Sequence, residues 1–301
     1  MDYGTLLSKS IRIAARHPSL WVFGLLSGYG SGFNFDTRMN WDFDWEHDRT
    51  FDLPFDPTPE VVGSFILAIL LLIVVFIVAH LIAYPALIEG INHIARGGVY
   101  RFGKCFSRGI DLFWRMFGMA FVGGVVAVGI IVALVVPSVV FLPLLIITIP
   151  VGVAAILLWT LILSLGTRAM VVRDSSILDA INEGFYLFKS RWSDCLIAGI
   201  IYFLIAFGVG IVLFIIAWAV FGPLNLLAES IAHGELAVLM IGLVLGLPIS
   251  LVVGGFTGVF FSSYVTLFYF ELVDPGCITD PNRAEPPLSP PPQSDSSGQA
   301  F

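Results

Sequence analysis

Two similar stretches, FGKCFSRGIDLFWRMF (102–117) and ILDAINEGFYLFKSRW (177–192), lie 75 residues apart and decide the fold. Their apolar positions recur with the spacing 4, 4, 3, 4, the stripe of an amphipathic helix. The aligned pairs are Phe102 with Ile177, Phe106 with Ile181, Ile110 with Phe185, Phe113 with Phe188, and Phe117 with Trp192. Each stretch leads directly into long apolar runs. We therefore predict a repeated unit, an amphipathic helix at the membrane surface followed by two membrane spans.

A fainter third copy opens the chain as LLSKSIRIAARHPSLW (6–21), with Trp21 in the place of Phe117 and Trp192. It lacks the glycine that the other two copies share at Gly109 and Gly184. Two spans per unit keep every copy in the same orientation. The predicted fold is an all-α polytopic membrane bundle of two or three parallel repeats.

The composition agrees with a membrane protein. The chain has 301 residues, of which 57% are hydrophobic, and its mean hydropathy is +0.93. Only 12% are charged, about half the share of a soluble domain. The net charge of -7 lacks the basic excess of a nucleic-acid-binding domain, so no nucleic-acid partner is expected. These values exclude a soluble globular enzyme and a disordered chain.

Six apolar runs predict about six spans within a transmembrane domain over residues 1–273. The predicted spans are 19–33, 61–85, 116–138, 144–166, 196–221 and 236–272. The first is short and Gly-rich and follows basic residues. We interpret it as a retained span, with a cleaved signal and a re-entrant or interfacial segment as alternatives. An acidic extracytoplasmic loop is predicted over 34–60, and a disordered Pro/Ser-rich cytoplasmic tail over 274–301.

Charge predicts the orientation. If the N-terminus lies inside, every Lys and Arg except Arg38 and Arg49 falls on an inner segment. The positive-inside rule then places both termini in the cytoplasm and the chain in the cell (inner) membrane. Cys105, Cys195 and Cys277 share that side, so reduced thiols are expected.

One face of the middle amphipathic helix carries cations at intervals of 3, 4 and 7 residues, namely Arg101, Lys104, Arg108 and Arg115. Such a helix lies in the headgroup layer with its cations toward anionic lipid. Anionic headgroups on the cytoplasmic side, or a protein partner, are therefore candidate ligands. A plain topology anchor is the alternative.

A stripe of small residues follows the last predicted span in steps of four. It contains Gly242, Gly246, Ser250, Gly254 and Gly258, and continues through Ser262 and Thr266. Small residues let membrane helices approach closely. We expect a contact with another helix of the same chain; a homodimer seam and the lining of a polar pathway are alternatives. Pro248 is expected to kink this long run.

The polar candidates near the second span are His80, Tyr84, Glu89 and His93. Intramembrane ionisable groups are the default functional candidates. Glu89 and His93 could supply two metal ligands from one helix face, but no further His or Cys has matching spacing. We therefore expect an interfacial Glu–His pair, a backbone hydrogen bond for His80, and no metal or cofactor.

No nucleophile-elbow, zinc-protease or P-loop motif occurs. HPSLWVFGLLSG (17–28), the amphipathic-helix pattern and the six-span layout resemble a group of poorly characterised bacterial and archaeal multi-pass proteins. That group includes the membrane-anchor domain of glycerophosphodiester phosphodiesterases. The resemblance covers about residues 5–273 and implies a helical membrane domain, without an activity.

The leading hypothesis is a non-enzymatic membrane protein with an accessory, scaffolding or lipid-organising role. The alternative is a transporter or permease-like protein for an apolar or lipid substrate. A third reading is a membrane enzyme acting near His80 and Glu89.

Overall fold

The computed structural model describes residues 2–28, 59–98, 100–140, 145–228, 244 and 246–274. In this part of the chain the secondary structure is helical and contains no strand, which confirms the all-α class. The helices are α1 (Tyr3–Arg16), η1 (Pro18–Leu20), α2 (Trp21–Leu26), α3 (Pro59–Ala95), α4 (Phe102–Asp111), α5 (Phe113–Val140), α6 (Leu145–Arg173), α7 (Ile177–Ser190), α8 (Trp192–Ala228) and α10 (Leu247–Val273).

Five helices of the described residues are long and apolar enough to cross a membrane: α3, α5, α6, α8 and α10. The chain is therefore a multi-pass helical membrane protein. The spans run past the predicted limits at their polar ends, since α3 continues to Ala95 and α6 to Arg173. Apolar composition locates the centre of a span, whereas backbone hydrogen bonding carries the helix into the polar layer.

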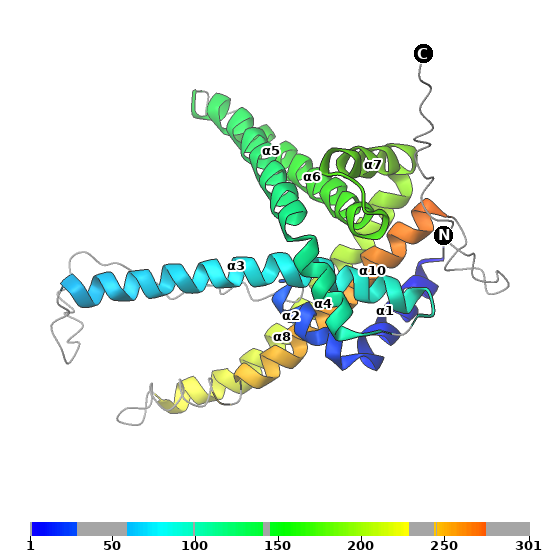
Figure 1. Cartoon of the computed structure of the whole chain (residues 1–301). Coiled ribbons are helices and arrows are strands. Elements are labelled where there is room, and N and C mark those ends of the chain that lie inside the picture. The colour runs from blue at the N-terminus through cyan, green and yellow to red at the C-terminus, as the bar shows by residue number, and fades with distance from the viewer. Residues whose placement is uncertain are drawn as a thin grey trace, which may run out of the picture.

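Short helices gather at one end of the spans, and this assembly is called the hub (Figure 1). The hub consists of α1, α2, α4 and α7 with the C-terminal halves of α3, α6 and α10. From it extend three arms, formed by α3, by α5 with α6, and by α8 with α10 (Figure 1). The hub is organised around α10, because 72% of its most apolar window is buried, against 22% or less in the other spans.

Local sequence explains where two hub helices begin. The Asp2 carboxylate accepts hydrogen bonds from the amides of Gly4 and Thr5, which caps α1. Its bonds with Thr5 are the main reason that the pKa of Asp2 lies below its ordinary value. At α7, the Ser176 hydroxyl accepts from the amide of Asp179.

Three glycines let hub helices cross spans at very short range. A Cβ added to Gly109 of α4 would collide with the carbonyl oxygen of Ile82 on α3. A Cβ on Gly184 of α7 would lie 2.5 Å from the carbonyl oxygen of Ile162 on α6. The third crossing, of α2 over α10, has the same form.

A Cβ on Gly24 of α2 would lie 2.5 Å from the carbonyl oxygen of Gly255 on α10. In each crossing the next contact is four residues further along the span, at Ala86, Gly166 and Val259 respectively. Each crossing therefore needs a residue without a side chain.

The amphipathic helices bury equivalent faces. The buried set has the spacing 4, 3 in each helix: Leu6, Ser10 and Ile13 in α1; Cys105, Gly109 and Leu112 at α4; Ala180, Gly184 and Leu187 in α7. α1 packs on α10, α4 on α3, and α7 on α6. The middle position is always small, which allows the close approach.

The predicted first span over 19–33 is wrong within its described part. Residues 18–20 form η1, and α2 ends at Leu26, after which Gly28 has a left-handed φ of 67°. Six residues extend only about 9 Å, too short to cross a bilayer. The apolar character of this segment arises because Phe23 and Gly24 are buried in the hub.

The kink expected at Pro248 stays a prediction, because most of residues 241–246 lie outside the described residues. Pro248 lies in the first turn of α10, where a missing amide proton costs no helical hydrogen bond. Residues 29–58, Gly242, Cys277 and the tail from 275 lie outside the described residues, so the acidic loop and the tail are untested predictions.

The spans α5 and α6 lie side by side (Figure 1). The Trp159 indole donates to the carbonyl oxygen of Gly123 at 3.0 Å, and Leu163 fills the space beside that glycine. α8 joins α10 through Tyr264, whose hydroxyl donates to the Ala198 carbonyl oxygen at 3.3 Å.

Candidate functional site

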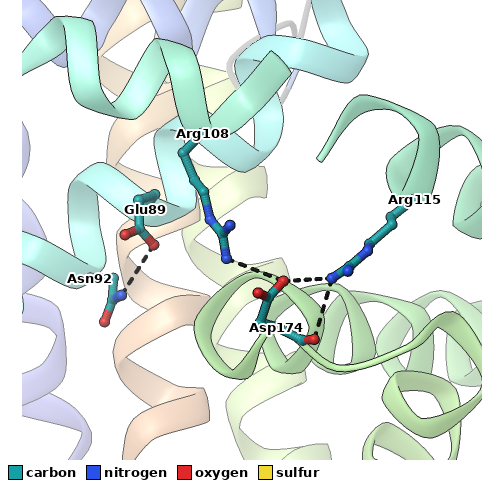
Figure 2. Close-up of polar contacts among 5 residues, drawn as sticks. All are labelled: Glu89, Asn92, Arg108, Arg115 and Asp174. Carbon is teal, nitrogen blue, oxygen red and sulfur yellow. Dashed lines mark hydrogen bonds and ion pairs between the residues drawn. The ribbon is translucent and has the colours of Figure 1, made fainter. Parts of the chain in front are cut away.

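Two arginines from the successive helices α4 and α5 converge on one carboxylate (Figure 2). Arg108 of α4 lies 3.2 Å from Asp174 Oδ1, and Arg115 of α5 forms a shorter ion pair with the same oxygen. Arg115 also donates to the Asp174 carbonyl oxygen at 3.3 Å. This group, Arg108, Arg115 and Asp174, is called the arginine clasp. It fastens α4 and α5 to the connection between α6 and α7.

Asp174 has an unusual backbone. Its φ of 57° makes it the one non-glycine residue with a positive φ among those described. The left-handed conformation costs a side-chain-bearing residue roughly 1 kcal/mol, and Asp and Asn tolerate it best. Ser175 and Ser176 follow, and Ser176 caps α7, so the sharp turn joins two helices through three residues.

The clasp lies at the ends of two candidate spans. Arg115 is in the first turn of α5, and Asp174 directly follows the last residue of α6. Neighbouring aromatics are exposed, with Trp114 at 76% and Phe117 at 47%. Exposed aromatics at a span end are typical of the membrane interface.

α4 presents three distinct faces. Cys105 and Gly109 are buried against the hub. Phe102, Phe106 and Ile110 remain more than two-fifths exposed on a second face. At 100° per residue, the predicted cations Lys104 and Arg108 lie roughly opposite that apolar face. Of the other two predicted cations, Arg101 is the extended N-cap of α4 and Arg115 lies on α5. Each of the four is exposed or half-buried. A docked helix with an apolar side and a basic side suits the lipid headgroup layer.

The burial of Cys105 on α4 lowers the reactivity of its thiol. Burial, with a smaller contribution from the charge of Glu89, raises the pKa of the Cys105 thiol to about 11. The thiolate is the reactive form, so this cysteine is a packing residue. Cys105 and Cys195 are both free thiols, as expected.

The predicted polar set near α3 does not converge on one site. His80 Nδ1 lies 3.2 Å from the carbonyl oxygen of Leu26, and its ring stacks on Tyr84. Glu89 lies about 14 Å further along the helix. It pairs with His93 at 3.2 Å. It also accepts a hydrogen bond of 3.2 Å from the Asn92 side chain (Figure 2).

No group of three or more potential metal ligands occurs among the described residues. His80 instead lines an apolar groove of about 410 Å³ between α3 and α5. The other lining residues are Phe76, Ile77, Leu81, Phe117, Ala120 and Phe121. The predicted polar residues therefore lie in two separate places on α3, one around His80 and one around Glu89.

Tyr84 forms a hydrogen bond with Arg168, which the charge pattern of the sequence placed on a polar inner segment. Arg168 of α6 is fully buried, and its guanidinium donates to the Tyr84 hydroxyl at 3.3 Å. It also donates to the backbone and side-chain oxygens of Ser164 at 2.6 and 2.9 Å. This buried charge links α6 to α3. Its sequence position alone gave no sign of burial.

A second polar contact outside the predictions joins α6, α7 and α10. Arg173 lies 3.0 Å from Glu183, which accepts a hydrogen bond of 2.8 Å from Tyr269. At the start of the chain, the Tyr3 hydroxyl donates to Asp194 at 3.4 Å. Burial, and then the charge of Asp194, raises the pKa of Tyr3.

The small-residue stripe contributes to the hub. Gly254, Gly258, Ser262 and Thr266 are buried, whereas Gly246 and Ser250 are half-buried. A Cβ on Gly258 would collide with Gly24, so the stripe meets α2 of the same chain.

Comparison with known proteins identifies the family of this chain. No curated protein and no solved structure matches the chain. A family model described as a family of unknown function, DUF7544, matches residues 20–274. That range includes α2, every described span and the arginine clasp. The chain therefore belongs to DUF7544, a family whose function is unknown.

Proposed function

We propose that this protein is a non-enzymatic component of the cell membrane that organises anionic lipid headgroups around its hub. The observation that carries the proposal is the surface of α4. Its basic residues and its exposed Phe102 and Phe106 lie on opposite sides, while the third side is docked on α3. This geometry suits insertion of the aromatics among acyl chains with the cations at phosphate level.

The same proposal places the hub and both termini in the cytoplasm. The basic residues of α1, α4 and α7 belong to the hub, and anionic lipids attract basic segments to the cytoplasmic leaflet. An accessory role agrees with the resemblance to membrane-anchor domains, which we retain as part of the proposal.

Three parallel repeats are part of this proposal. They are supported by the three glycine crossings and by the matching buried faces of α1, α4 and α7. In this scheme the crossing glycines Gly109 and Gly184 lie on the amphipathic helices α4 and α7, whereas the crossing glycine of the first copy, Gly24, lies on α2. Each repeat then brings one amphipathic helix to the same leaflet.

The test compares lipid binding by the wild type and two variants in nanodiscs. Arg101→Gln with Lys104→Gln removes two cations outside the clasp. Arg101→Lys with Lys104→Arg keeps the charge and serves as the matched control. We expect the first variant to lose most of the preference for phosphatidylglycerol over phosphatidylcholine, measured by native mass spectrometry. An unchanged preference in the charge-removing variant would refute the proposal.

A transporter or permease-like role for an apolar or lipid substrate is the second candidate. It is favoured by the apolar groove between α3 and α5, which is open to the surroundings of the spans and large enough for part of an acyl chain. Purified protein in liposomes with a fluorescent lipid separates the two roles. Protein-dependent transfer of that lipid between leaflets would support transport, and its absence would support the organising role.

A further inference from the structure

We propose that Arg108 and Arg115 bind the phosphate-monoester headgroup of a lipid, and that Asp174 is an intramolecular competitor for this site. The inference rests on the proposed function and adds the class of headgroup and a form of regulation. In the structure the competitor occupies the site, since both arginines contact Asp174 Oδ1.

The chemistry of the clasp favours a phosphate. A guanidinium donates through a planar fork that fits carboxylate and phosphate oxygens alike. Here two guanidiniums share one carboxylate oxygen, so a single negative charge faces two positive ones (Figure 2). A phosphate monoester carries about -1.5 to -2 charges and three acceptor oxygens near neutral pH. It matches both the charge and the donors of the pair better than a carboxylate does.

The position of the clasp suits a lipid headgroup. Arg115 lies in the first turn of one candidate span and Asp174 directly follows another, so the ion pairs lie at the ends of these spans, where a headgroup can reach them. Trp114, beside Arg115, is 76% exposed, as expected for a side chain in the interface. Arg101 at the N-cap of α4 and Lys104 within this helix add positive charge, while the exposed Asp111 opposes it.

The clasp can exchange its ligand. The side chains of Arg108, Arg115 and Asp174 are 33%, 46% and 55% exposed, so water screens both ion pairs. Asp174 also holds a strained left-handed backbone, and release of the carboxylate leaves that turn free to relax. A ligand of higher charge therefore displaces Asp174 at small cost.

The experiment removes the competitor without removing the turn. Asp174→Asn eliminates the negative charge, and Asn tolerates a left-handed backbone as well as Asp does. Asp111→Asn on the exposed surface of α4 changes the net charge equally and is the matched control. Asp174→Gly is a second variant with no backbone strain, used if the first one does not fold. Binding is measured on nanodiscs of phosphatidylcholine containing either phosphatidic acid or phosphatidylglycerol.

We expect Asp174→Asn to tighten binding to phosphatidic acid about five-fold, with a smaller gain for phosphatidylglycerol. Asp111→Asn should stay within about two-fold of wild type for both lipids, since it frees neither arginine. Arg108→Gln with Arg115→Gln should abolish the selectivity between the two anionic lipids.

Three results would overturn the inference. Equal effects of Asp174→Asn and Asp111→Asn would show a general charge effect. Equal gains for both lipids would remove the phosphate-monoester selectivity, and tighter binding of inorganic phosphate alone would refute the lipid assignment. A wild-type protein with no preference for either anionic lipid would instead refute the proposed function, so the two failures are distinguishable.

Discussion

The glycine crossing of α4 over α3 gives the sharpest test of the packing. Gly109→Ala adds one methyl group where the Ile82 carbonyl oxygen already lies, with the Ala86 Cβ at 3.2 Å. Gly103→Ala makes the same change on the same helix, with no other atom within 4 Å of the new Cβ. The two variants thus share composition and helix and differ in the space available.

Their stabilities are expected to differ in a known direction. Replacing Gly by Ala within a helix is favourable by up to about 1 kcal/mol, while overpacking costs about 1–3 kcal/mol. Gly103→Ala should therefore be neutral or slightly stabilising, and Gly109→Ala should be less stable than it by about 1–3 kcal/mol. For a chain of this size, that corresponds to a lower melting midpoint by roughly 5 °C.

The assay is thermal unfolding in detergent micelles, followed by tryptophan fluorescence at one scan rate. Gly184→Ala provides a parallel measurement at the crossing of α7 over α6, with Gly199→Ala as its control because that Cβ also meets no atom. Equal midpoints for Gly109→Ala and Gly103→Ala would refute the close approach of α4 and α3.

Three further outcomes are expected. Tyr84→Phe removes a hydrogen-bond acceptor of the buried Arg168 and should destabilise the protein by about 1–3 kcal/mol in the same thermal assay. The control Tyr186→Phe should have no effect, because the Tyr186 side chain is 70% exposed. In a protein retaining only Cys105, maleimide labelling at pH 8 should be about 100-fold slower in the folded than in the denatured state. The reason is that a thiol pKa of about 11 instead of 9 lowers the thiolate fraction by that factor. Equal labelling rates in the two states would contradict the burial of Cys105. Ser107→Cys and Asn182→Cys, both on exposed positions, should react with an impermeant reagent from the cytoplasmic side, and labelling from opposite sides would refute the parallel repeat.

Periodicity and hydropathy predicted most helices because these signals are local. The apolar stripe over 102–117 marks α4 and the start of α5, and the uncharged runs mark the long spans. The prediction of a membrane span over 19–33 failed for a physical reason. A short helix buried in a protein core and a membrane span are equally apolar, and only the contact of Gly24 with α10 distinguishes them.

The candidate site was only half predictable. The basic face of α4 follows from sequence spacing, since Arg101, Lys104 and Arg108 recur at helical intervals. The partner of that face does not, because Asp174 lies 59 residues beyond Arg115 and reaches it through tertiary packing. Arg168 is similar, since its hydrogen-bond partner Tyr84 lies on a separate helix, 84 residues earlier in the chain.

The packing of α1 on α10 has a consequence for how the protein is made. The first helix of the chain finds its partner in the last span, so it leaves the ribosome long before that partner exists. At typical synthesis rates the delay is on the order of tens of seconds. During this interval α10 is not yet present to cover Leu6, Ser10 and Ile13. The face of α1 that later packs on α10 therefore lies on the membrane surface. Assembly of the hub is thus completed only when α10 inserts, and truncation before Leu247 would leave the N-terminal helix without its binding site.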